Sequence, residues 1–210
     1  MAATEVELRQ VWRQVAGRNG GYDHLLESMF DRHREPHRRY HTLTHVMWVL
    51  RHITALVAAG EPTTDTAAVQ LAALWHDAVY DPAANDNEAR SALLGSAAAA
   101  ELGWSTSRQQ LVERLVLATA THRPADDDEA MLVDADLAIL GAPTQDYVAY
   151  VDGVRSEYSH IDEDAWRAGR SAVLTGFLEQ KQLFTTRTMR VLREARARAN
   201  MAGELAGLAG

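Results

Sequence analysis

Residues 71–82 read LAALWHDAVYDP and contain the pair of residues that decides how this sequence is interpreted. The segment 67–79 around that pair carries apolar side chains at three- and four-residue spacing, which predicts an amphipathic helix. His76 and Asp77 follow the apolar run. Neighbouring residues on a helix point about 100° apart, so the two side chains can bind one ion only near a helix end or beside further ligands. Taken alone, the pair indicates no more than a polar helix terminus.

The same helical periodicity covers nearly the whole chain, and β-branched residues never alternate over a useful length. Glycine and proline separate the helical segments, so the connections between them are short. No linker or internal repeat divides the 210 residues. We therefore expect one all-α domain over residues 1–210, built from packed antiparallel helices. The predicted helices span residues 4–17, 22–33, 46–57, 67–79, 87–102, 107–121, 128–140, 144–158, 163–182 and 186–205.

Composition excludes several classes of function. The chain has no cysteine, which excludes thiolate ligands and a cysteine nucleophile and leaves metals that accept nitrogen and oxygen. A formal net charge of −8 argues against general nucleic-acid binding, which needs a basic face. No apolar stretch reaches 18 residues, so we expect no membrane partner. The N-terminus lacks the layout of a signal peptide, which favours a cytoplasmic protein.

Upstream of the pair, residues 38–46 read RRYHTLTHV and place His41 and His45 four residues apart. That spacing puts both on one face of a helix beginning there, with Thr42 as a good N-cap. His45 then lies in the first turn, where the helix dipole disfavours the imidazolium. A neutral imidazole is the form that binds a metal.

Downstream, residues 132–141 read LVDADLAILG and set Asp134 and Asp136 in an apolar helix. Carboxylates in such surroundings are costly unless they are paired or bound to an ion. Residues two apart on a helix point to different sides, so we expect one of the two to face inward and the other to face solvent.

The order of His, then His-Asp, then Asp on successive helices resembles the HD superfamily of metal-dependent phosphohydrolases. The segments EPHRRYHTLTHV (35–46), WHDAVYDPAANDNEARSA (75–92), LVDADLAILG (132–141), VRSEYSHID (154–162) and WRAGRSAVLTGFL (166–178) are more narrowly similar to the group described as predicted metal-dependent HD phosphohydrolases. The resemblance covers roughly residues 34–184. It implies an HD-type helical bundle with flanking N- and C-terminal helices.

By position, the resemblance implies that His45, His76, Asp77 and Asp136 are the metal ligands. Asp134 is the alternative for the last of them. Members with two metals add two further histidines between the HD pair and the last aspartate, whereas this chain has only His122 there. That difference favours one divalent ion, drawn from Mn, Fe, Co, Ni, Zn and Mg.

Other residues near these motifs are candidates for catalysis or substrate binding. Besides the ligand Asp77, Glu88 could position or deprotonate the attacking water, or could simply occupy the first turn of a helix. His122 could be a general acid or an ordinary histidine at a helix C-terminus. For binding a phosphorylated substrate we single out residues near the expected metal, with the arginines as phosphate ligands. They are Arg38, Arg39, Tyr40, His41 and Arg170.

The expected function is metal-assisted hydrolysis of a phosphate ester in a nucleotide or another small phosphorylated metabolite. Two alternatives stay open. One is a non-catalytic nucleotide-binding or regulatory module, and the other is a metal-dependent oxygenase on the same fold, which would need a second metal. Arginines recur every three residues at 187, 190, 193 and 196. This pattern fits a solvated helix face or a subunit contact, so a homo-oligomer is possible.

Overall fold

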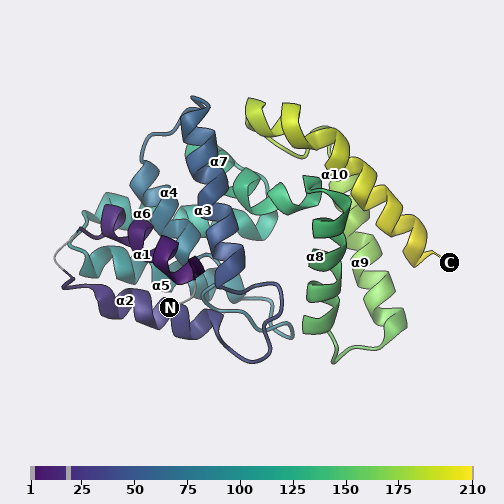
Figure 1. Cartoon of the computed structure of the whole chain (residues 1–210), viewed down its shortest axis with the longest axis horizontal. Coiled ribbons are helices and arrows are strands. Elements are labelled where there is room, and N and C mark those ends of the chain that lie inside the picture. The colour runs from purple at the N-terminus through teal and green to yellow at the C-terminus, as the bar shows by residue number, and fades with distance from the viewer. Residues whose placement is uncertain (1–2, 18–19, 210) are drawn as a thin grey trace.

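The computed structural model describes residues 3–17 and 20–209, and every regular element among them is a helix (Figure 1). The prediction of an all-α fold is confirmed. The elements are α1 (Ala3–Val15), α2 (Asp23–His33), α3 (Leu43–Ala58), α4 (Thr66–Trp75), α5 (Asn87–Glu101), α6 (Thr106–Thr121), α7 (Asp127–Asp136), the 3-10 helix η1 (Leu137–Gly141), α8 (Thr144–Glu157), α9 (Glu163–Leu178) and α10 (Arg187–Leu208).

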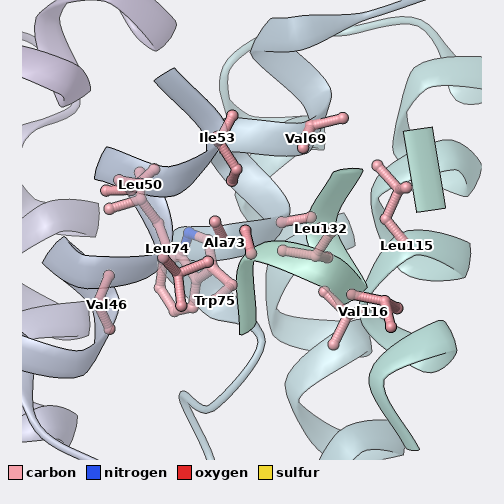
Figure 2. Packing of buried hydrophobic residues seen from close by; sticks show 14 of the residues in the cluster. Val46, Leu50, Ile53, Val69, Ala73, Leu74, Trp75, Leu115, Val116 and Leu132 are labelled. Atoms are coloured by element: carbon pink, nitrogen blue, oxygen red, sulfur yellow. The ribbon is translucent and has the colours of Figure 1, made fainter. Parts of the chain in front are cut away.

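Helix α4 is the centre of the hydrophobic core. It packs against α1, α3, α5, α6 and α7, and its residues from Leu71 to Trp75 are all buried. Figure 2 shows Leu74 and Trp75 among side chains from the surrounding helices. A helix that is covered on all sides is apolar all round, which explains the run before His76. The end of α4 therefore lies in the interior, and the side chain of His76 is buried there.

Several predicted helices end earlier than the periodicity indicated, and α9 ends at Leu178, before the expected residue 182. Helix α4 stops at Trp75, before the expected residue 79, and His76 is its C-cap. The expected helix 128–140 changes at Leu137 into the 3-10 helix η1. The last residue of η1, Gly141, lies against α10, where a Cβ atom would come within 2.6 Å of the Cβ of Arg193. Only glycine allows this approach.

The C-terminal helices form a separate group joined to the first seven by η1 (Figure 1). Helices α8 and α10 pack on η1, and α10 also packs on α9. Helix α10 continues to Leu208, beyond the expected residue 205. Within the described ranges, no helix has the length and apolar character needed to cross a membrane.

Candidate metal centre

Four side chains from three parts of the chain converge at the buried end of α4. His45 lies in the first turn of α3, His76 and Asp77 follow α4, and Asp136 is the last residue of α7. The Nε2 atom of His45 lies 3.0 Å from Nε2 of His76 and 3.1 Å from Oδ1 of Asp136. Oδ2 of Asp77 lies 3.3 Å from His45 Nε2 and 3.2 Å from His76 Nε2. All four residues of the predicted ligand set are therefore together.

The spacing of these atoms fits a divalent ion. Ligands about 2.1 Å from an ion and about 90–110° apart lie roughly 3.0–3.4 Å from one another. The distances between the two imidazoles, and from the imidazoles to the carboxylates, run from 3.0 to 3.6 Å. His45, His76 and Asp136 form a group that could hold a metal ion. Asp77 lies outside that group, but its carboxylate is beside both imidazoles. Two imidazoles and two carboxylates suit a borderline or hard divalent cation.

Backbone contacts set the orientation of two of these residues. His76 Nδ1 lies 2.9 Å from the carbonyl oxygen of Ala73, to which it donates. In the neutral ring the proton therefore sits on Nδ1, which leaves the Nε2 lone pair available to a metal. Thr42 caps α3, as predicted, by accepting a hydrogen bond from the Thr44 N–H. The cap begins the helix just ahead of His45 and places it in the first turn.

The imidazoles and carboxylates of the cluster stabilise one another's charged forms. Burial opposes protonation of His76, but the charge of Asp77 and a hydrogen bond to Asp136 raise the pKa of His76 well above 6.5. Burial likewise opposes ionisation of Asp77, yet His76 and His45 hold the pKa of Asp77 well below 3.8. The cluster thus holds its carboxylates ionised beside protonated imidazoles. A divalent ion would replace those protons, so metal uptake should release protons and tighten as pH rises.

Arg38 holds the backbone around Asp77. Its side chain is fully buried, and its guanidinium donates to the carbonyl oxygens of Asp77 at 2.8 Å, Ala78 at 3.2 Å and His41 at 3.1 Å. We expected Arg38 to bind substrate phosphate. Its position corrects that expectation, because its Nε, Nη1 and Nη2 all donate to protein atoms, with Glu35 as the fourth partner. Arg38 positions Asp77 instead.

Glu157 is a residue of the site that the sequence interpretation did not single out. Its buried carboxylate accepts the backbone N–H groups of Arg39, Tyr40 and His41, and also His41 Nδ1 at 2.7 Å. Burial alone would raise the pKa of Glu157, but the hydrogen bond from His41 and the backbone donors lower it from 4.5 to about 2. Glu157 thereby fastens α8 to the segment before α3.

The contact between α8 and this segment also depends on a glycine. A Cβ atom on Gly153 would lie 3.1 Å from the Cβ of Tyr40, tighter than an ordinary contact.

His41 itself precedes α3 and is not on its helical face, which corrects the expected placement. Its ring stacks on Tyr80, with ring centres 4.2 Å apart. The only sequence signal for Glu157 was its place in the segment VRSEYSHID, used for the family resemblance.

The two aspartates of α7 have different tasks, and neither faces solvent. Asp134 is completely buried and accepts the N–H groups of Thr185 at 3.0 Å and Thr186 at 2.6 Å. It therefore fixes the loop that begins α10. Asp136 faces the cluster. The expectation that one of the pair would point outward is wrong, because the turn before α10 supplies a second set of buried donors.

Two cavities reach the cluster, and Tyr40, Asp136, Ile139 and Tyr150 line both. The larger has a volume of about 600 Å³ and includes His41 and Asp77. The smaller has a volume of about 310 Å³ and includes His45. Because Asp77 and Asp136 are on its wall, a molecule in the larger cavity could contact an ion at the cluster.

Several further candidates line these cavities. His122 Nε2 lies 3.5 Å from Oδ2 of Asp136, and His122 is a C-cap with left-handed backbone, φ 52°. A non-glycine residue there is strained, and such strain is often kept at functional sites.

Glu88 lines the larger cavity in the first turn of α5. Arg39 lines the smaller one. Arg170 is at the wall of the larger cavity but is paired with Glu204.

Comparison with family models, with curated proteins and with solved structures found no match to this chain. The resemblance to HD proteins therefore stays a prediction, and the geometry of the cluster has to support the function by itself.

Proposed function

We propose that this protein is a metal-dependent phosphohydrolase of the HD type that acts on a small phosphorylated metabolite. The observation that carries the proposal is the group of His45, His76 and Asp136, with Asp77 beside both imidazoles, at the wall of a cavity of about 600 Å³. A site of this kind holds a divalent ion with positions left for water and substrate. The chain has no cysteine to serve as nucleophile, and activated water needs none.

His45, His76, Asp77 and Asp136 would hold the ion. When bound, it would lower the pKa of water and offset the charge of a phosphoryl oxygen. Around it, Arg38 and Glu157 keep the two segments that carry Asp77 and His45 in place. Such partners beyond the ligands usually set ligand orientation and metal affinity.

In the proposed reaction, a water oxygen bonds to phosphorus and the bond between phosphorus and the ester oxygen breaks. Water loses one proton and the departing alcohol gains one, so the products are an alcohol and inorganic phosphate. His122 is placed to carry this proton, since its Nε2 lies beside Asp136 at the wall of the larger cavity. Tyr40 keeps its hydroxyl protonated, because burial and then the charges of Tyr150 and Asp136 raise its pKa. It can therefore donate to a phosphoryl oxygen.

The experiment is a panel of small phosphomonoesters and nucleotides offered to protein loaded separately with Mn²⁺, Co²⁺, Ni²⁺ or Mg²⁺. We expect phosphate release from at least one compound, and we expect Asp77→Ala to abolish it. If metal-loaded protein turns over no compound, or if wild type and Asp77→Ala release phosphate equally, the hydrolase proposal fails. Saturable binding without product would then indicate a binding module.

A further inference from the structure

The larger cavity contains one arginine, and that arginine is already neutralised. Arg170 donates through Nε to Glu204 at 2.7 Å and through Nη2 to the same carboxylate at 3.1 Å. Its Nη1 donates to the Tyr150 hydroxyl at 3.1 Å. Both Arg170 and Glu204 are 8% exposed at the side chain. We expected Arg170 to bind phosphate, but its charge is cancelled by a buried partner and its donors are occupied.

Glu88 is the opposite case, a carboxylate of the same cavity without a cation. It is half-buried in the first turn of α5. Among the residues that the structure describes, none forms a hydrogen bond or an ion pair with it. Its charge is felt at Tyr158, whose pKa is raised by burial and then by the charges of Glu157 and Glu88. Glu88 thus faces the cavity with its charge uncompensated.

The other carboxylates in and beside the cavity have partners. Asp77 and Asp136 would face the ion, and Glu157 accepts a hydrogen bond from the ring of His41. Beside Glu88 the walls carry uncharged polar side chains such as Asn85 and Tyr158, and apolar ones such as Ile161, Trp166 and Phe177. The part of a substrate that extends away from the phosphoryl group would therefore meet a mixed polar and apolar surface and the one carboxylate that has no cationic partner among the described residues.

We propose that Glu88 makes this cavity select phosphomonoesters whose organic group carries a cationic amine, and reject those with a second phosphate or a carboxylate. This inference rests on the proposed hydrolase function. An ammonium group gains a charged hydrogen bond to Glu88, whereas an additional anion meets repulsion and finds no free arginine. A partly exposed ion pair of this kind corresponds to about a 1.5- to 5-fold preference.

The test uses ω-aminoalkyl phosphates and ω-hydroxyalkyl phosphates with matched chains of two to six carbons. The two compounds of each pair differ only in the charge at the end away from the phosphate. The chain length at which kcat/KM differs most shows how far from the metal the ammonium group binds. We expect kcat/KM of wild type to favour the amino compound, mainly through KM. Glu88→Gln should lower kcat/KM for the amino compound to the value for the matching hydroxy compound. Glu179→Gln, an exposed carboxylate that lines neither cavity, should keep the preference.

Two results would overturn the inference. One is a wild type that does not distinguish the members of any pair. The other is a Glu88→Gln variant that lowers kcat for both members equally, which would place Glu88 in the chemistry and not in recognition. If metal-loaded protein hydrolyses no compound, the proposed function fails, and calorimetric binding of the same pairs decides the inference separately. Equal affinity of wild type for amino and hydroxy compounds would then refute it.

Discussion

The Nε2 atoms of His45 and His76 lie 3.0 Å apart, although the two residues are separated by 31 positions. Because Nδ1 of His76 donates to the carbonyl of Ala73, its Nε2 carries a lone pair whenever the ring is neutral. At this distance two unprotonated nitrogens repel, so a proton or a cation between them is favoured. The folded chain therefore brings together atoms that need a positive charge, and two carboxylates stand beside them.

The two aspartates of α7 give a matched pair of variants. We predict that Asp136→Ala abolishes stoichiometric metal binding, because it removes a ligand. Asp134→Ala should keep the metal but lower the free energy of unfolding by about 1–3 kcal/mol, because it leaves the N–H groups of Thr185 and Thr186 without an acceptor. Metal content and urea unfolding of both purified variants measure the difference. Loss of metal from Asp134→Ala alone would mean that the last ligand has been misassigned.

Arg38 and Arg39 are neighbours with different roles. Arg38→Lys should weaken metal affinity by about 10- to 100-fold, the usual effect of losing a residue that orients ligands. Lysine cannot hold the carbonyls of His41, Asp77 and Ala78 together, as the guanidinium does. Arg39→Lys should leave metal affinity unchanged, because Arg39 donates to the Pro36 and Arg38 carbonyls. Metal titration compares them, and equal affinities would refute the role given to Arg38.

The ligand set could be predicted from the sequence because the order of its motifs resembles the HD superfamily. His76 and Asp77 stand at the end of an apolar run, and the run is apolar because α4 is surrounded by other helices. The N-cap at Thr42 could be predicted from its side chain, and this cap places His45 in the first turn of α3. The apolar run and the helix cap are short-range patterns, which a sequence displays directly, whereas the four ligands came from the family resemblance.

The partners of the site could not be predicted in the same way. Arg38 and Arg170 look like any surface arginine in the sequence, and only the folded chain shows that one holds carbonyl oxygens and the other pairs with Glu204. Glu157 meets residues 39–41 across more than a hundred positions. The different roles of Asp134 and Asp136 depend on where the turn before α10 lies. Contacts of this range follow from tertiary packing, which has no local signal.

Glu157 should make stability depend on acid pH. Its pKa is about 2 in the folded protein and 4.5 ordinarily, so its contribution is complete above about pH 4.5 and is lost as pH falls toward 2. We predict that Glu157→Gln lowers the free energy of unfolding at neutral pH by on the order of 2 kcal/mol. The difference in the free energy of unfolding between wild type and Glu157→Gln should become smaller below pH 4.5. Denaturant unfolding across that range measures it, and a gap that is constant with pH would contradict this role.

Anomalous X-ray diffraction from crystals loaded with Mn²⁺ or Co²⁺ shows whether His45, His76, Asp77 and Asp136 hold one divalent ion. We expect one strong anomalous peak per chain. That peak should lie about 2.0–2.3 Å from Nε2 of His45, Nε2 of His76 and a carboxylate oxygen of Asp77 and of Asp136. A peak elsewhere, or no peak at this cluster from protein that binds the metal in solution, would contradict it.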